Sequence, residues 1–433
     1  MTAEILPSPA VTTKYFGCAA GIGAAAAPAP ASAPVSSVPD GLDFKLSQCF
    51  GDCSSVDQVT EADILTAVQF DQTGEYLATG DRGGRIVVFR QNTPIKNKLR
   101  RASDFKFFTE FQSHVSEFDY LKSLEIEEKI NQIKWCQRAG RSLMLLSTND
   151  KTVKLWRIKE MPNRRFVEPP EGGEGGWEGE GGDMEVCAQP RRVFADAHAY
   201  HINAVDPCCD GEHFLSADDL RVNLWSLETA GAAAARGGGG GGGAHTAVDL
   251  KPRSMEELRE VVTCAAFHPR AAHVFLYSTS RGAIRVSDLR AGARCDRSVR
   301  VMDEPPDPHT KTFFSDIVAS ISDIKVTQCG QFVVARDYLT LKLWDARMEA
   351  RPVKTIPVHD HLRPRLCDLY ENDCIFDKFE CAVSGDAATV VTGSYGNLCS
   401  MYSRAGSAQA TLEISKVRHV VRIVRIVQVD ASL

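Results

Sequence analysis

The stretch LLSTNDKTVKLWRI, Leu145–Ile158, carries the pattern that decides the fold of this 433-residue chain. A hydrophobic run leads into a polar turn at Asn149-Asp150, and a second run ends on an aromatic residue, Trp156. Asn and Asp tolerate the backbone conformations of tight turns, and the flanking runs have the alternation and β-branched content of strands. The stretch therefore predicts a β-hairpin.

The same pattern occurs six times along the chain. The hairpins are Tyr76–Arg90, Leu145–Ile158, Phe214–Leu227, Phe275–Arg290, Phe332–Arg347 and Val390–Arg404. The position of Trp156, here called the anchor, is held by Phe89, Trp156, Trp225, Ser287, Trp344 and Tyr402, at spacings of 67, 69, 62, 57 and 58 residues. A strand with period-two alternation precedes the hairpins, for example at Leu65–Asp71, Ile130–Cys136 and Ile321–Thr327.

Three strand-forming runs per repeat and a recurring anchor predict an all-β WD-repeat β-propeller with four-stranded blades. A pair of β-sandwiches would explain the strands and turns, but not an anchor at a nearly fixed offset from an Asp-containing turn. Six blades are recognisable. Their period exceeds the usual value of about 40–45 residues, so we expect long insertions in the loops.

Composition sets the domain boundaries. Residues 1–41 are rich in Ala and Pro and predict a disordered tail, although a targeting segment is an alternative. The propeller is expected over 42–414, with low-complexity insertions at 161–193 and 230–244, and a divergent basic and aliphatic tail over 415–433. The glycine run of the second insertion is interpreted as a flexible linker because it lacks the Gly-Lys-Ser/Thr ending of a phosphate loop.

Several function classes are disfavoured. The net charge of −6 argues against nucleic-acid binding, and no apolar run reaches the roughly 18 residues of a membrane span. The 14 cysteines form no Cys-x-x-Cys pair, which is typical of reduced thiols in a cytosolic protein. His198 and His201 are three residues apart, and hydrogen bonding is favoured over metal ligation. No nucleophile elbow or kinase signature occurs, so we predict no enzymatic activity and no cofactor.

Two blocks combine acidic and aromatic residues, Ser116–Ile130 and Tyr370–Glu380. One interpretation is an ordinary solvated, charged face. The other is an acidic groove whose field attracts basic segments of partner proteins. Composition alone does not separate them.

Long irregular motifs carry a family resemblance. EFDYLKSLEIEEKIN, AHAYHIN, LSADDLRVNLW and LYENDCIFDKFEC closely resemble the fifty-five-kilodalton class of regulatory B subunits of protein phosphatase 2A, over about Phe44 to Leu412. The resemblance implies a seven-bladed propeller that docks on a HEAT-repeat scaffold subunit next to a separate catalytic subunit. It further implies that the chain selects phosphoserine and phosphothreonine substrates with basic segments. The expected compartment is the cytoplasm (cytosol), with the nucleus as a second one.

The resemblance also implies a substrate-binding set. Asp219 and Glu371 would pair with substrate Lys or Arg, and Leu258 and Phe376 would make apolar contacts. For Leu258 the alternative is a core residue of a short helix. The full set is Glu61, Phe118, Glu125, Glu127, Lys129, Tyr200, Asp219, Leu258, Tyr370, Glu371, Phe376 and Lys378.

The chain departs from the family pattern in two places. The family's arm, which grips the scaffold, corresponds to Met161–Val193, which is shorter here and rich in Gly and Glu. After Ser415 the sequence no longer matches, so we expect the last blade to be largely missing. Phe44–Gly51 is the expected N-terminal strand, and the Val/Ile-rich tail could add one strand. We expect lower stability than in seven-bladed relatives; a truncated gene model or a splice variant is one explanation.

Two other functions are alternatives for this sequence. A generic WD-repeat adaptor, such as a ubiquitin-ligase substrate receptor, is the main alternative. A hydrolase is the third, but no residue set for it is present.

Overall fold

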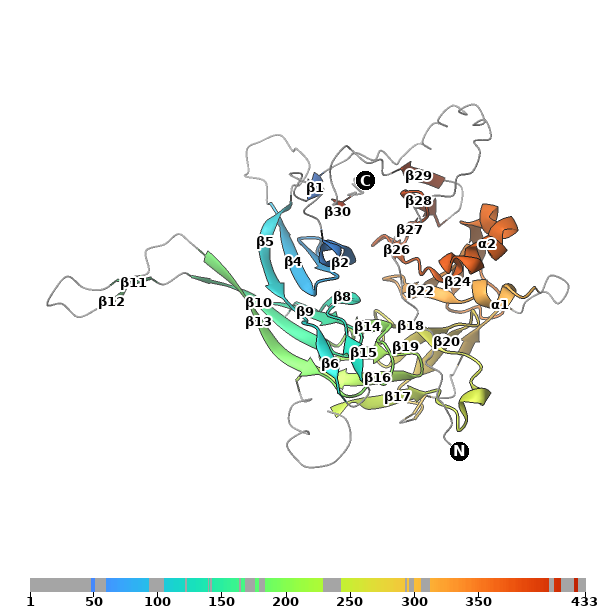
Figure 1. The fold of residues 1–433 in the computed structure, drawn as a ribbon, viewed down its shortest axis with the longest axis horizontal. Coiled ribbons are helices and arrows are strands. Elements are labelled where there is room, and N and C mark those ends of the chain that lie inside the picture. Colours follow the sequence, from blue (N-terminus) through green and yellow to red (C-terminus); the bar gives the residue numbers. More distant parts are fainter. Residues whose placement is uncertain are drawn as a thin grey trace. The chain divides into compact units, whose positions relative to one another are not determined.

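The structure is a computed structural model and is drawn in Figure 1. It describes residues 48–50, 60–92, 105–120, 123–138, 140, 142–162, 165–167, 176–178, 184–228, 243–292, 294–295, 300–304, 312–404, 409–413 and 424–426. The predicted tail at 1–41 lies outside these residues, as does most of the 230–244 linker. The chain divides into two compact units, which are described in turn.

The N-terminal unit spans Leu46–Leu250 and Arg418–Gln428 and contains three four-stranded antiparallel sheets. Blade 1 is β2 (Leu65–Phe70), β3 (Tyr76–Asp81), β4 (Arg85–Gln91) and β5 (Phe105–Gln112). Blade 2 is β8 (Gln132–Trp135), β9 (Leu143–Thr148), β10 (Val153–Pro162) and β13 (Met184–Phe194). Blade 3 is β14 (Ala204–Pro207), β15 (His213–Ala217), β16 (Arg221–Ser226) and β17 (His245–Asp249).

Smaller elements complete this unit. They are the 3-10 turn η2 (Glu61–Asp63) and the strand pairs β6 (Glu117–Asp119) with β7 (Leu124–Ile126), β11 (Arg165–Val167) with β12 (Gly176–Glu178), and β1 (Gln48–Phe50) with β30 (Val424–Ile426). The β1–β30 pair confirms an N-terminal strand within Phe44–Gly51 and one strand from the aliphatic tail.

The C-terminal unit, built on Lys251–Val417, contains blades 4 to 6. Blade 4 is β18 (Val262–Phe267), β19 (Val274–Thr279), β20 (Ile284–Asp288) and β21 (Arg300–Met302); blade 5 is β22 (Ile321–Val326), β23 (Phe332–Asp337), β24 (Thr340–Asp345) and β25 (Lys354–Pro357). Blade 6 is β26 (Cys381–Val383), β27 (Thr389–Gly393), β28 (Leu398–Ser403) and β29 (Gln409–Glu413). Its helices are η5 (Met255–Glu257), α1 (Ser315–Val318), η6 (Asp360–Arg365), α2 (Leu366–Glu371) and η7 (Cys374–Phe376).

Six four-stranded sheets confirm the predicted six-bladed β-propeller fold. Within each sheet the four strands lie in their order along the chain and pair antiparallel, and turns of two to four residues join the second strand to the third. No helix in the described ranges is long and apolar enough to cross a membrane.

The anchors occupy one register position in all six blades. They pair as Leu77–Phe89, Leu145–Trp156, Phe214–Trp225, Phe275–Ser287, Val333–Trp344 and Val390–Tyr402. Trp225 and Trp344 are each 1% exposed, so burial of these large rings stabilises their blades. Ser287 is the exception: it is buried, and its hydroxyl has no hydrogen-bond partner among the described residues.

Three blades have a bulge in the innermost strand, and in two of them the bulged side chain bonds the neighbouring blade, whereas the Thr263 hydroxyl lies 2.9 Å from Ser278 Oγ of its own blade. The pairing of the first two strands skips Thr66 in blade 1, Thr263 in blade 4 and Ser322 in blade 5. A bulge redirects a side chain out of the ladder. The Thr66 hydroxyl donates to the carbonyl of Ile130 at 2.5 Å, and the Ser322 hydroxyl donates to that of Phe379 at 2.6 Å. Each bond reaches the start of the next blade.

The insertion expected at 161–193 contains paired strands in its described part. β10 and β13 pair from Val153–Phe194 out to Pro162–Met184, and β11 and β12 form a further two-stranded ladder (Figure 1). Met161 and Met184 are 45% and 55% exposed on this hairpin. The Gly/Glu-rich segment therefore includes an ordered antiparallel hairpin, called the arm below.

Candidate functional site

The predicted substrate-binding residues share one end of the sheets in each unit. We call it the site end: the end at which the second strand of a blade turns into the third, and at which the fourth strand leads to the next blade. Antiparallel order places both kinds of connection at the same end. Seven predicted residues lie there in the N-terminal unit and five in the C-terminal unit.

Glu61 begins η2, just before blade 1. It forms an ion pair with Arg82 on the β3–β4 hairpin, while Arg85 bonds Asp63 at 2.6 Å and Asp81 at 2.9 Å. The Glu61 side chain is 69% exposed. Its ion-pair partner Arg82 lies outside the predicted set, and an exposed pair of this kind contributes about 0–1 kcal/mol.

The β6–β7 hairpin presents two aromatic rings beside carboxylates. Phe118 pairs with Glu125 across the strands, and the Phe118 and Tyr120 rings pack edge to face at 5.1 Å. Glu125 accepts a hydrogen bond from the Ser116 hydroxyl at 3.3 Å. Phe118 is 50% exposed and Tyr120 86%. Large exposed rings are typical of interaction surfaces. Tyr120 was absent from the predicted set, although it lies in the same acidic-aromatic block.

Glu127 and Lys129 follow this hairpin. The exposed Glu127 uses its backbone carbonyl to accept from the Asn149 side chain at 3.1 Å, which ties the segment to blade 2. Lys129 acts electrostatically on Asp150. Burial raises the pKa of Asp150, but hydrogen bonds from His201 and Asn131 together with the Lys129 charge outweigh burial, so the pKa is lowered.

Asp219 lies on the β15–β16 hairpin, and Tyr200 precedes blade 3. Asp219 Oδ1 accepts from the Asn203 side chain at 2.8 Å, and Tyr200 is exposed. The hydrogen bond to Asp150 raises the pKa of His201, and the Asp219 carboxylate adds to this effect. Lys129 and Asp219 are therefore linked electrostatically through Asp150 and His201. Neither linking residue belonged to the predicted set.

The C-terminal unit presents an aromatic cluster at its site end. The Tyr370 ring lies 5.9 Å from Phe376, 5.7 Å from Phe313 and 5.9 Å from Phe314. Tyr370 is 40% exposed, Phe376 41% and Phe313 69%. Glu371, at the end of α2, is exposed beside them. Phe313 was missed, although the adjacent aromatics Phe313-Phe314 were a signal.

A network of hydrogen-bonded polar side chains lies next to this aromatic cluster. Tyr395 donates to Asp377 at 2.7 Å, and its hydroxyl lies 3.0 Å from that of Tyr338. Burial raises the pKa of Asp377 and raises that of Tyr338 to about 12. Lys378 follows directly and is half-buried. The network fixes the segment that carries Phe376, which is what a preformed contact surface needs.

Leu258 lies immediately after η5. Ser254 caps this turn by accepting from the Glu256 amide at 3.4 Å, and the turn itself buries no residue. Leu258 is half-buried, while Met255 in the turn is 50% exposed. Both interpretations of Leu258, a core position and a surface contact, are compatible with this placement.

His198 and His201 have different environments. The buried His198 donates through Nδ1 to Asp218 at 2.9 Å and accepts through Nε2 from Ser216 at 2.6 Å. Ser216 in turn accepts from Trp225 Nε1 at 2.8 Å. His201 faces Asp150 instead, at 3.4 Å. His198 is therefore part of a structural network, and no His/Cys/Asp/Glu cluster able to hold a metal occurs in the part of the chain that the structure describes.

Comparison with known proteins adds to this picture. Residues 188–226 match the model of the WD domain, G-beta repeat, a range that includes the first three strands of blade 3 and the His198–Trp225 network. The chain is 50% identical over 382 residues to the regulatory B subunit of protein phosphatase PP2A from Schizosaccharomyces pombe, covering 84% of this chain and 79% of that protein. It is 48% identical over 377 residues to the protein of the same name from Candida tropicalis, covering 84% and 71%.

A plant relative extends the match. The chain is 44% identical over 435 residues to the beta isoform of the 55 kDa regulatory B subunit of serine/threonine protein phosphatase 2A from Arabidopsis thaliana, covering 89% of this chain and 85% of the relative. The chain belongs to the family of regulatory B subunits of protein phosphatase 2A.

Proposed function

We propose that this chain is a regulatory subunit of protein phosphatase 2A that holds phosphoserine and phosphothreonine substrates by their basic segments. In this proposal a separate catalytic subunit performs the hydrolysis, and this chain contributes no reactive group. Family membership supports the regulatory role. The single observation that carries the substrate role is the collection of exposed aromatics and carboxylates at the site end of each unit.

The chemistry of these surfaces suits a cationic peptide. Carboxylates at Glu125, Glu127, Asp219 and Glu371 can pair with Lys or Arg, and rings such as Tyr370 can cover the alkyl stems and stack on guanidinium groups. Exposed ion pairs contribute about 0–1 kcal/mol each. Selection would therefore depend on several weak contacts and would weaken as salt screens them.

The arm supports association with a HEAT-repeat scaffold subunit. β10 and β13 hold it as a long antiparallel hairpin, and the exposed Met161 and Met184 side chains give it apolar surface. Methionine adapts to an uneven partner surface at little cost. We propose that this hairpin contacts the scaffold, and that assembly takes place in the cytosol and also in the nucleus.

The assembly proposal is tested by co-purification of the full chain with the scaffold and catalytic subunits. Retention of both on size exclusion is expected, and fractionation of cells shows the compartment. If neither subunit is retained, the assembly proposal is wrong and the WD-repeat adaptor alternative replaces it.

The substrate proposal is tested by charge reversal at one residue. Asp219→Lys should weaken binding of a Lys/Arg-rich phosphopeptide by about three- to tenfold, the equivalent of a few exposed charge contacts. Glu212→Lys is the matched control, because the exposed Glu212 lies in the β14–β15 turn at the opposite end of the same blade. Equal loss in both variants, or loss of holoenzyme assembly by Asp219→Lys, would contradict the assignment.

A further inference from the structure

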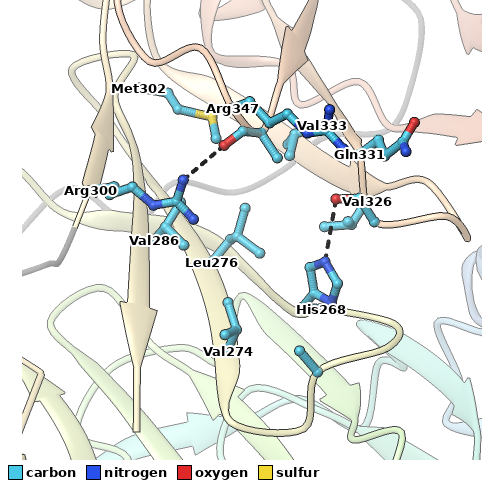
Figure 2. Close-up of a pocket in the computed structure, with 13 residues that line it drawn as sticks. His268, Val274, Leu276, Val286, Arg300, Met302, Val326, Gln331, Val333 and Arg347 are labelled. Atoms are coloured by element: carbon cyan, nitrogen blue, oxygen red, sulfur yellow. Dashed lines mark hydrogen bonds between the residues drawn. The ribbon is translucent and has the colours of Figure 1, made fainter. Parts of the chain in front are cut away.

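A cavity of about 270 Å³ lies between blades 4 and 5 of the C-terminal unit. Val274, Leu276 and Val286 line one side, and Val326 and Val333 the other (Figure 2). Leu276 is 2% exposed and Val333 1%, so the cavity reaches the packed interior of the unit. Protein interiors contain few voids larger than a water molecule. A space of this size therefore needs an explanation.

The register of the blades explains the space. Trp135 pairs with Leu145 beside the anchor Trp156, and Val326 pairs with Val333 beside the anchor Trp344, so Trp135 and Val326 are equivalent. Tyr76 and Val274 are likewise equivalent, as the first residues of the second strands.

Between blades 1 and 2 this position is filled by rings. Tyr76 and Trp135 pack there with ring centroids 6.2 Å apart, and both belong to one buried apolar cluster. Between blades 4 and 5 the two positions are held by Val274 and Val326. Two aliphatic side chains thus replace two aromatic ones, and the missing rings leave room for an aromatic group from outside.

The charged side chains that line the cavity are arginines, and Gln331 is a neutral polar neighbour. Arg300 and Arg347 line it; Arg300 donates to the Ala346 carbonyl at 3.0 Å and lies 3.5 Å from Glu349. Arg347 is exposed, and its guanidinium has no ion-pair partner among the residues that the structure describes. His268 donates from Nε2 to the Gly330 carbonyl at 3.3 Å, which fixes its ring at the wall (Figure 2). A ligand entering here meets an apolar interior and positive charge.

We propose that this cavity is a docking site for a peptide segment of a partner protein that inserts one aromatic side chain and places adjacent acidic residues on Arg300 and Arg347. The size fits, because a dry apolar cavity of about 150 Å³ already accepts benzene. Charge complementarity selects acidic neighbours, since Arg binds carboxylates in a bidentate manner.

The site is separate from the proposed substrate surface. The cavity is lined from the β18–β19 turn at His268, the β22–β23 turn at Gly330 and the β24–β25 turn at Arg347. These turns lie at the end of the sheets opposite the site end. An acidic-aromatic partner and a basic substrate could therefore bind the C-terminal unit at the same time.

The experiment uses the full chain and a labelled peptide, acetyl-Asp-Glu-Phe-Asp-Glu-amide, in fluorescence anisotropy at low salt. Two control peptides replace Phe by Ala or all acidic residues by Lys. We expect saturable binding of the acidic Phe peptide, and at least tenfold weaker binding of both controls. No saturable binding up to millimolar peptide, or equal binding of either control peptide, would overturn the proposal.

Variants locate the binding. Val274→Tyr restores the ring found between blades 1 and 2 and should reduce affinity at least tenfold with circular dichroism unchanged. Arg347→Glu should reduce it about three- to tenfold. Arg281→Glu, on the β19–β20 hairpin at the other end of blade 4, is the matched control and should bind as the unsubstituted chain does.

Certain results with these variants would contradict the proposal. Wild-type affinity in folded Val274→Tyr places the peptide elsewhere and overturns it. Should Val274→Tyr not fold, unchanged affinity in Arg347→Glu has the same meaning. If Val274→Tyr instead abolishes self-association on size exclusion and leaves peptide affinity intact, the occupant is a second copy of this chain.

Discussion

Replacing Asp218 by Ala should be among the most damaging single changes in blade 3. The Asp218 side chain is buried and accepts three hydrogen bonds: from His198 Nδ1 at 2.9 Å, and from the amides of Leu220 at 2.9 Å and Arg221 at 2.7 Å. Each buried donor left without an acceptor costs about 1–3 kcal/mol. Since Arg221 is half-buried and its amide can regain water, we expect a loss of about 3–5 kcal/mol in unfolding free energy.

Asp218→Asn is the matched comparison. Asn149 occupies the equivalent turn of blade 2, and its Oδ1 accepts from the amides of Lys151 and Thr152 at 3.0 and 2.8 Å. An amide at position 218 can therefore keep both turn bonds, while its bond to His198 requires the other imidazole tautomer. We expect Asp218→Asn to cost about 1 kcal/mol, the contribution of one buried hydrogen bond.

Urea unfolding followed by tryptophan fluorescence measures both variants. Trp225, one of five tryptophans, lies at the end of the same network, through Ser216, so its emission contributes to the signal that follows unfolding. The reasoning is refuted if Asp218→Ala loses less than about 1 kcal/mol, or if the Asn and Ala variants are equally unstable.

Three further predictions concern the C-terminal unit. Burial and the Arg336 charge lower the pKa of the fully buried His359 to about 4. As the pH falls, the His359 imidazole is therefore protonated in the unfolded chain before it is protonated in the folded chain. The free energy of unfolding should thus decrease as the pH drops from 6.5 to about 4. In His359→Gln the free energy of unfolding should decrease by about 2–3 kcal/mol less over the same pH range, as measured by denaturant unfolding at each pH. Ser287→Ala should be neutral or stabilising by up to about 1 kcal/mol in thermal melting, because it removes a buried hydroxyl without a described partner; destabilisation would contradict this. Gly330→Ala should lower the unfolding free energy by about 1–3 kcal/mol, because Gly330 has φ +75° and a Cβ there would lie 2.3 Å from His268 Nε2; an unchanged urea midpoint would disprove the predicted strain.

The blades were predictable because their determinants are local. Alternating strands, turn residues such as Asn149 and the anchor aromatics are separated by only a few residues, and the register confirms all six anchors. The strands β1 and β30 were also anticipated, from one apolar run near each end, but their pairing with each other was not. The paired strands of the arm were not anticipated, because the sequence of 161–193 was interpreted only as a low-complexity insertion, whereas β10 and β13 pair there.

The candidate site was predicted less completely, because it joins segments distant in sequence. The contact of Asp150 with His201 spans two blades, and nothing in either local pattern announces it. The same holds for Phe313 beside Tyr370. The cavity between blades 4 and 5 depends on which side chains face each other across two sheets, so only the register reveals that Val274 lacks the aromatic bulk of Tyr76.

The hydroxyls at the inner-strand bulges also bear on how such a chain can change over evolution. Thr66 and Ser322 each bind a main-chain carbonyl of the following repeat, and every residue type supplies that acceptor. Substitutions in the following repeat therefore leave the link intact as long as the local backbone path is kept. Blades 2 and 6 can therefore diverge side chain by side chain without losing this attachment to the repeat that precedes each of them.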